Sequence, residues 1–365
     1  MQGNSCAFQY LFVLLRPNSR NMKLDKSKYY MGGAALSLLL ILATGCFYTF
    51  TAFSQKGETH YLYIDRDDTV DSVCAKLAPI ASHHTMTGLK TMFRHGNYEK
   101  HLHTGRYAVK PGMSTFSVFR MLRSGTQEPL NLTIPEVRTL TRMAAILGDK
   151  LMLDSTEIAT ALADPSRYRE WGLNGADTCT LPGYFVPNTY QVYWNTELDQ
   201  LMERLVKEHD RFWKGARETK AKVMGLTPNE VCTLASIVDE ETSNSAEKPM
   251  IAGMYLNRLK AGMPLQADPT VKFALKDFAA RRIYRKMLTY DSPYNTYKYE
   301  GLPPGPIKVA SIGGIDAVLN YVEHNFLYMC AKEDFSGTHN FAQTYQEHLK
   351  NAAKYSQALN ERGIK

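Results

Sequence analysis

The feature that constrains the fold most is an uncharged, apolar stretch near the N-terminus. Met31 to Phe50 spans twenty residues without an Asp, Glu, Lys or Arg. A helix of this length is about 30 Å long, which matches the hydrocarbon core of a bilayer. In lipid, a lone segment can satisfy its backbone hydrogen bonds only as a helix. We therefore predict a transmembrane anchor over residues 31–53, with Tyr48, Phe50 and Phe53 clustered at its far end.

The basic residues predict how this anchor is oriented. The chain has a net charge of +7, and five basic residues precede the anchor against the single acid Asp25: Arg16, Arg20, Lys23, Lys26 and Lys28. Because basic flanks stay in the cytoplasm, residues 1–30 are expected there and the rest of the chain on the outer side. The part of the chain after the anchor carries only a small net positive charge. The excess of basic residues therefore indicates membrane topology, and no nucleic-acid partner is expected.

Two alternatives stay open for the N-terminal region. Thr44-Gly45-Cys46 could be a lipid-attachment site, although Ala43 stands where a branched aliphatic residue is usual. Translation could also begin at Met22, since MKLDKSKYY leads directly into the apolar stretch.

The six cysteines form no CxxC or Cys/His metal pattern. Buried free thiols are therefore expected in preference to a disulfide framework. A pairing of Cys179 stays open if the compartment is oxidising.

Residues 55–126 are predicted to form a small α+β module with two similar halves. Tyr61–Ile64 and Tyr107–Val109 are strand candidates, and helices are expected to begin near Thr69 and Ser114. Residues 127–365 also combine helix-like and strand-like patterns of apolar residues. Helices are expected from Thr139, from Asp154, over 196–216 and over 244–260, with a strand over 326–331.

The stretch TPNEVCTLASIVDEET, residues 227–242, is predicted to form the central helix of this larger part. Thr227, Pro228 and Glu230 form an N-terminal capping box. Apolar residues then recur at helical spacing and define one buried face. When the helical spacing is extended to the end of this segment, Glu241 lies at the edge of the buried face, whereas Glu240 lies on the solvated side. Burial and the helix C-terminus would both raise the pKa of Glu241, as a general acid requires.

The segments after this helix carry a resemblance to a known family. They include Glu241-Thr242, NRL at 257–259, GMPLQ at 262–266, DPT at 268–270, YNTY at 294–297 and the turn-rich run 301–307. In this order they closely resemble the catalytic domain of the YceG-like family of endolytic murein transglycosylases. The resemblance is good from about Leu130 onward. The module at 55–126 loosely resembles the family's LysM-like region, and a spacer that binds no ligand is the alternative.

The resemblance implies an activity and a location. A membrane-anchored lytic transglycosylase would cleave the bond between N-acetylmuramic acid and N-acetylglucosamine within glycan strands and leave 1,6-anhydro ends. Glu241 would act first as acid and then as base, with no metal or organic cofactor. The expected setting is the bacterial inner membrane, with a periplasmic catalytic domain at residues 127–365. Peptidoglycan synthases are possible partners.

The motifs also suggest which residues bind the glycan. Besides the catalytic Glu241, the candidate substrate-binding residues are Thr242, Asn257, Gln266, Asp268, Tyr294, Asn295, Thr296, Tyr297 and His339. Gln266 and Asp268 are expected in a loop, from which they can reach back towards Glu241. The basic segment 273–288 is expected to be a solvated helix face, and contact with an anionic glycan or lipid headgroup is the alternative.

The sequence departs from the family at one loop. Pro182 stands where an acid is common, and Asn188 where an Asp is common. A second catalytic carboxylate is therefore not expected from this loop. Two other functions stay open. One is a muramidase that uses water, and the other is a non-enzymatic peptidoglycan-binding or cell-division scaffold.

Overall fold

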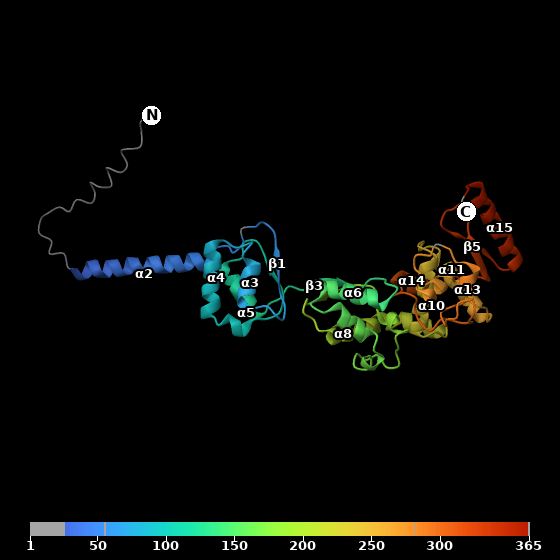
Figure 1. The fold of residues 1–365 in the computed structure, drawn as a ribbon, viewed down its shortest axis with the longest axis horizontal. Helices are drawn as coiled ribbons and strands as arrows, with labels where there is room; N and C mark the ends of the chain where they lie inside the picture. The colour runs from blue at the N-terminus through green and yellow to red at the C-terminus, as the bar shows by residue number, and fades with distance from the viewer. Residues whose placement is uncertain (1–25, 55, 281, 364–365) are drawn as a thin grey trace, which may run out of the picture. The chain divides into compact units, whose positions relative to one another are not determined.

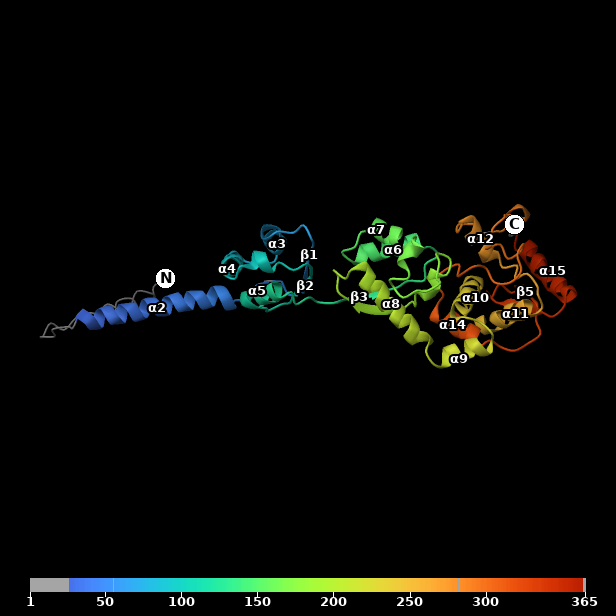
Figure 2. The same cartoon turned by 90° about the horizontal axis from the view of Figure 1, so that it is seen from below.

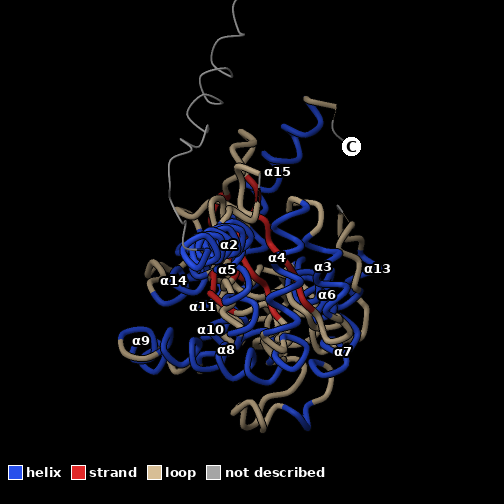
Figure 3. The backbone as a smooth tube through the Cα atoms, turned by 90° about the vertical axis from the view of Figure 1, so that its left-hand side faces the viewer, coloured by secondary structure: helices blue, strands red, loops and turns tan. Residues whose placement is uncertain are grey.

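The computed structural model describes residues 26–54, 56–280 and 282–363. Helices make up most of the chain and the strands are short, as the blue and red segments of Figure 3 show. The strands in this part of the chain pair in three two-stranded sheets. This mixture confirms the predicted α+β class. The chain divides into two compact units, one of residues up to 103 with 107–126 and one of 104–106 with 127–365.

Helix α2 (Lys26–Phe50) carries the predicted anchor (Figure 1). Among the described residues, its segment Lys28–Phe50 is the one helix long and apolar enough to cross a membrane. Large apolar side chains along it, such as Leu39 and Ile41, are more than half exposed. A single N-terminal apolar helix is thus confirmed by length and composition. The residues before Lys26, on which the predicted orientation mainly depends, lie outside the described part of the chain.

The first unit continues with β1 (His60–Ile64), α3 (Val70–Leu77), α4 (His83–His95), the 3-10 turn η1 (Tyr98–His101), β2 (Gly105–Val109) and α5 (Thr115–Ser124). Strand β1 pairs with β2. The three helices begin after the polar caps Thr69, Ser82 and Ser114, whose side chains accept backbone N–H bonds. The predicted strands and the two predicted helix starts of this module are confirmed.

Phe53 corrects the predicted far end of the anchor. Helix α2 ends at Phe50, and the Phe53 side chain is fully buried in the core of the first unit. Its N–H donates to the Met113 carbonyl at 2.7 Å, and Ala52 forms a β-bridge with Ser114. From sequence alone, an aromatic residue just after an apolar helix can lie either at the membrane interface or in the core of the next domain. The packing of Phe53 shows that it lies in the core.

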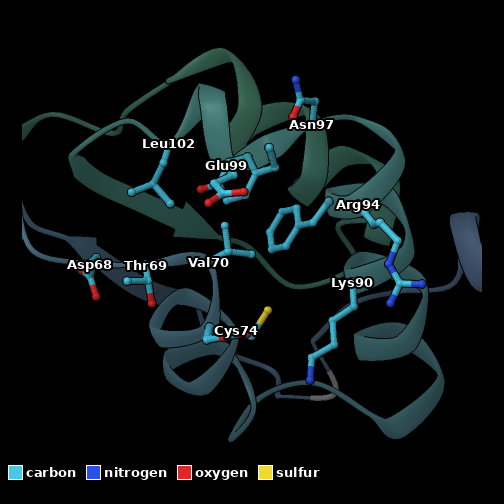
Figure 4. A pocket seen from close by; sticks show the side chains of 12 residues that line it. Asp68, Thr69, Val70, Cys74, Lys90, Arg94, Asn97, Glu99 and Leu102 are labelled. Carbon is cyan, nitrogen blue, oxygen red and sulfur yellow. The ribbon is translucent and has the colours of Figure 1, made fainter.

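The first unit also contains a pocket of about 650 Å³ beside the start of α3 and the second half of α4. Lys90 and Arg94 lie across this pocket from Asp68 and Thr69 (Figure 4). Its volume falls within the range of small-molecule sites.

The first half of the second unit packs helices around a short antiparallel pair of strands. Its elements are β3 (Leu130–Thr133), α6 (Leu140–Lys150), α7 (Ser155–Leu162), η2 (Pro165–Arg167), η3 (Leu181–Tyr184), β4 (Thr189–Val192) and α8 (Leu198–Trp213). Leu132 of β3 faces Tyr190 of β4 in the register. The predicted helix starts at Thr139 and Asp154 are confirmed as N-caps. These elements share one apolar core that includes Trp171.

The second half contains α9 (Ala216–Val223), α10 (Pro228–Glu241), α11 (Lys248–Lys260), α12 (Asp268–Leu275), α13 (Arg285–Leu288), α14 (Ile312–Leu319), β5 (Tyr328–Ala331), β6 (His339–Ala342) and α15 (Tyr345–Glu361). Helix α10 contacts α9, α11, α12, α14 and η3, and it lies among α9, α11 and α14 in Figure 2. The predicted capping box of Thr227 and Glu230 is present.

The prediction of one buried face on α10 is wrong. Every residue from Val231 to Val238 is buried. The helix is surrounded by neighbours on all sides, so its polar residues Thr233 and Ser236 are enclosed as well. Their hydroxyl groups donate to backbone carbonyls of the same helix, at 2.8 and 2.7 Å. Helical periodicity identifies a buried stripe but cannot show that the opposite side is covered too.

Candidate active site

Glu241 is the last residue of α10, and Thr242 leaves the helix in an extended conformation. Glu241 is partly buried and lines a pocket. Burial raises the pKa of Glu241 to about 7. A hydrogen bond from Tyr255 lowers this pKa, and the charges of Asp268 and Glu240 raise it. The predicted rise and its main cause, burial, are confirmed.

The two acids before Glu241 have other partners. Asp239 has a side chain only 2% exposed, which accepts bonds from Lys248 at 2.6 Å and from the Ser311 N–H at 2.7 Å. Glu240, predicted to face solvent, is 18% exposed and forms an ion pair with Arg138 at 2.7 Å. The prediction for Glu240 is wrong because Arg138, which is distant in sequence, covers this side of the helix end. Among the three acids, Glu241 is the one without an ion pair in the described structure.

A pocket of about 320 Å³ surrounds the Glu241 carboxyl group. Four of the predicted substrate-binding residues line it: Gln266, Asp268, Tyr297 and His339. They come from the segment after α11, the start of α12, the YNTY motif and β6. Tertiary structure therefore brings together four motifs that are spread over the sequence from Gln266 to His339.

Hydrogen bonds fix two of these side chains. The Gln266 backbone has a positive φ of 53°, and its side-chain Oε1 accepts a bond from Arg258 at 2.6 Å. The Tyr297 hydroxyl donates to Asp268 Oδ1 at 2.6 Å. Asp268 is the first residue of α12, so it begins a helix and does not lie in a loop as predicted. Pro269 favours this helix start, because proline suits the first turn.

His339 is held by a buried acid. Its Nδ1 lies 3.0 Å from Glu247 Oε2, and its backbone N–H donates to Glu247 Oε1 at 2.6 Å. Glu247 is only 8% exposed. The carboxylate thus fixes both the imidazole ring and the start of β6 beside the pocket.

Thr242 and Asn257 are not among the pocket-lining residues. The Thr242 side chain is buried and accepts a bond from the Asn244 N–H at 3.1 Å. The Asn257 amide donates to the carbonyls of His324 and Phe326, at 2.6 and 3.1 Å. Both side chains support the chain segments around the pocket.

The first three residues of YNTY also lie outside the pocket lining. Tyr294 packs its ring against Phe273, with 4.7 Å between centroids. Asn295 is fully buried, and its amide donates to two backbone carbonyls at 2.9 and 2.7 Å. Thr296 is 1% exposed and accepts a bond from the Ala267 N–H at 3.0 Å. These residues hold the loop that presents Tyr297.

Five polar or charged residues that line the pocket were not among the predicted site residues: Tyr255, Arg258, Tyr328, Tyr345 and His348. Tyr255 and Arg258 lie three residues apart on α11, so they share a helix face, and Arg258 belongs to the NRL motif. That spacing could have suggested them. Tyr328, Tyr345 and His348 come from the C-terminal hairpin and α15, where no local pattern indicates a contact with Glu241.

The chemistry of the pocket defines a class of protein. One carboxyl group has a pKa near neutrality, so it can both donate and accept a proton. Tyrosine hydroxyls, an amide and a carboxylate around it suit a ligand rich in hydroxyl and amide groups. Among the described residues, no group of three His, Cys, Asp or Glu side chains is placed to hold a metal ion. Such a site is typical of acid–base enzymes that act on glycosidic bonds.

Comparison with known proteins then identifies the family. The profile of the YceG-like family matches residues 62–354, and the chain belongs to this family. It is 32% identical over 271 residues to a protein of Bacillus subtilis named endolytic murein transglycosylase, covering 71% of this chain and 74% of that protein. A Streptococcus pneumoniae protein of the same name is 28% identical over 70% of this chain, which spans about half of that longer relative.

A solved structure supports the fold. The crystal structure of the YceG-like protein lmo1499 from Listeria monocytogenes aligns with a TM-score of 0.55 and 26% sequence identity. The alignment covers 81% of this chain and 99% of the Listeria chain. The shared fold thus extends over most of the described residues.

Proposed function

We propose that this protein is a membrane-anchored endolytic lytic transglycosylase of peptidoglycan. The observation that carries the proposal is Glu241, a carboxyl group with a pKa of about 7 in a pocket lined by hydroxyl, amide and imidazole groups. The curated relatives named endolytic murein transglycosylase support the same activity.

The mechanism uses Glu241 twice. Protonated Glu241 donates its proton to the glycosidic oxygen between N-acetylmuramic acid and N-acetylglucosamine. As this bond breaks, positive charge develops at C1 of the muramic acid. The ionised carboxylate then accepts the proton of the C6 hydroxyl, whose oxygen bonds to C1 and closes the 1,6-anhydro ring. A pKa near the working pH lets one residue perform both steps.

The other predicted site residues divide into two groups. Gln266, Asp268, Tyr297 and His339 line the pocket and contact the glycan in this proposal. The remaining five act through the shape of the pocket, since their side chains bond to the backbone or pack in the interior: Thr242, Asn257, Tyr294, Asn295 and Thr296.

The anchor sets the location in this proposal. Residues 1–30 lie in the cytoplasm, residues 31–50 cross the inner membrane, and a LysM-like module at 55–126 precedes a periplasmic catalytic domain at 127–365. The apolar helix α2 and the basic residues before it support this arrangement. A catalytic domain close to the membrane would act on nascent strands, next to peptidoglycan synthases.

The decisive experiment is digestion of purified glycan strands by the full-length protein in detergent, with mass spectrometry of the products. We expect internal cleavage and 1,6-anhydro-N-acetylmuramic acid ends. Glu241→Gln should abolish cleavage and retain glycan binding, because it removes the acidic proton and keeps the shape. Glu240→Gln is the matched control and should retain activity, since Glu240 is paired with Arg138 outside the pocket lining.

Asp268 favours one alternative, a muramidase that uses water. Its carboxylate lines the same pocket as Glu241, and ordinary glycosidases use two carboxyl groups. Reducing N-acetylmuramic acid ends among the products would support this alternative and contradict ring closure. Full activity of Glu241→Gln would contradict both mechanisms.

A further inference from the structure

Tyr255 occupies a special place beside the candidate acid. It lies on α11 and is 1% exposed, and its hydroxyl group donates a hydrogen bond to Glu241 Oε1 at 2.9 Å. Helices α10 and α11 pack directly against each other. Two buried helices therefore hold the donor and the acceptor of this bond, which leaves the carboxyl group little freedom to turn.

This hydrogen bond distinguishes the two carboxyl oxygens. Oε1 is occupied by the Tyr255 hydroxyl, whereas Oε2 makes no hydrogen bond to the described residues. A neutral carboxylic acid carries its proton on one oxygen and accepts bonds best on the other. With Oε1 accepting from Tyr255, the acidic proton resides on Oε2.

Tyr255 itself is a poor proton donor to a substrate. Burial and the neighbouring Glu241 raise the pKa of Tyr255 well above its usual value. The hydroxyl therefore stays protonated through the neutral range and serves as a fixed donor. Its bond is stronger to the ionised form of Glu241 than to the neutral form, because the ion is the better acceptor.

We propose that Tyr255 is the positioning residue of the site: it directs the acid–base chemistry of Glu241 to Oε2 and stabilises the ionised form that accepts the second proton. The inference rests on the proposed function for its catalytic meaning. The geometry behind it, a buried donor on one carboxyl oxygen, stands independently.

Other charges also act on Glu241, so the contribution of Tyr255 must be isolated. Asp268 and Lys272 of α12 act on it in opposite directions, and Glu240 precedes it on α10. Arg258 lies near Tyr255, and His339 and His348 line the pocket. A Tyr255→Phe substitution leaves all of these groups in place and removes one hydroxyl.

The test measures kcat and KM of full-length Tyr255→Phe in detergent across pH 5 to 9. Without the donor, ionised Glu241 is less stable, so the alkaline limb of kcat should move up by roughly one pH unit or more. Loss of orientation should lower kcat by about tenfold or more, with a smaller change in KM. An alkaline limb and a kcat equal to those of the wild type would overturn the inference.

Tyr297→Phe is the matched control. It makes the same chemical change in the same pocket but removes a donor to Asp268. If the inference is right, Tyr297→Phe should leave the alkaline limb at the wild-type position. An equal shift in both variants would show a general effect of the pocket and would contradict a special role for Tyr255.

Two further measurements keep the test informative. Replacing Tyr255 with a ring-fluorinated tyrosine strengthens the donor, so the alkaline limb should move to lower pH. Thermal melts need no substrate: Tyr255→Phe should lose more stability than the wild type between pH 5 and 9, because its Glu241 is harder to ionise. Equal losses would contradict the hydrogen bond's role, whether or not the protein cleaves glycan.

Discussion

At the scale of single residues, Glu241 differs from its neighbours by what it lacks. Asp239 and Glu240 are neutralised by Lys248 and Arg138, whereas Glu241 has a tyrosine donor and no cation in contact. A carboxyl group with little water and no counter-ion holds its proton to higher pH. Burial is therefore the main cause of the pKa of about 7, and no cation in contact with Glu241 in the described structure offsets it.

This raised pKa predicts how stability depends on pH. The folded state binds the Glu241 proton more tightly than the unfolded chain does, where the pKa is about 4.3. The stability from this proton is fully present below about pH 4.3 and is lost as pH rises through about 7, by about 4 kcal/mol in all. Glu241→Gln cannot ionise, so it should be at least as stable as the wild type at pH 8.

Thermal melts of both proteins from pH 4 to pH 8 measure this difference. The advantage of Glu241→Gln should narrow towards pH 4, where the wild type is protonated too. A Gln variant clearly less stable at pH 8 would mean that the folded protein stabilises the ionised carboxylate.

At the scale of elements, the end of α10 is a junction of several segments. Asp239 connects it to α11 through Lys248 and to the start of α14 through Ser311. Glu240 connects it to Arg138, which lies just before α6. The buried contacts of Asp239 fix the orientation of the last helical turn, and with it the direction of Glu241.

The two junction acids should differ in their effect on stability. Asp239→Asn leaves the Lys248 ammonium, only 12% exposed, without its ion pair and should cost about 3 kcal/mol. Glu240→Gln breaks a pair whose arginine is 46% exposed. The more distant Lys308, 3.8 Å away, keeps its pair with Glu136, so this variant should cost less than about 1 kcal/mol. Chemical denaturation of the two variants provides the measurement. Equal costs would show that burial of the partner does not control the strength of these pairs.

At the scale of the whole molecule, the boundary between anchor and first unit has a defined position. Helix α2 ends at Phe50, and the core of the first unit already includes Phe53. Thr51 and Ala52 connect the helix to this core, and the Thr51 carbonyl accepts a hydrogen bond from the Thr115 N–H at 3.1 Å.

This boundary predicts where the anchor can be removed. A protein that begins at Thr51 should be soluble and folded, because it loses no core residue. One that begins at Gly57 lacks Phe53 and should melt at lower temperature, since deleting a buried phenylalanine costs about 3 kcal/mol or more. Calorimetry of both proteins tests this, and equal melting temperatures would place the boundary after Phe53.

Much of the architecture could be predicted from local patterns. An uncharged stretch at 31–50 and the caps at Thr69, Ser114, Thr139, Asp154 and Thr227 all concern residues within a few turns of one another. Helix formation and capping depend on such neighbours, so the sequence alone indicates them. The ordered motifs from Glu241 to His339 likewise indicated the family before any geometry was known.

Tertiary structure decided which of those motif residues face Glu241. Gln266, Asp268, Tyr297 and His339 line the pocket, whereas Asn257, Asn295 and Thr296 bond to buried backbone groups. All are polar, so their residue types do not separate the two roles. The difference depends on where segments distant in sequence leave a carbonyl unsatisfied or a cavity open, and only packing in three dimensions determines that.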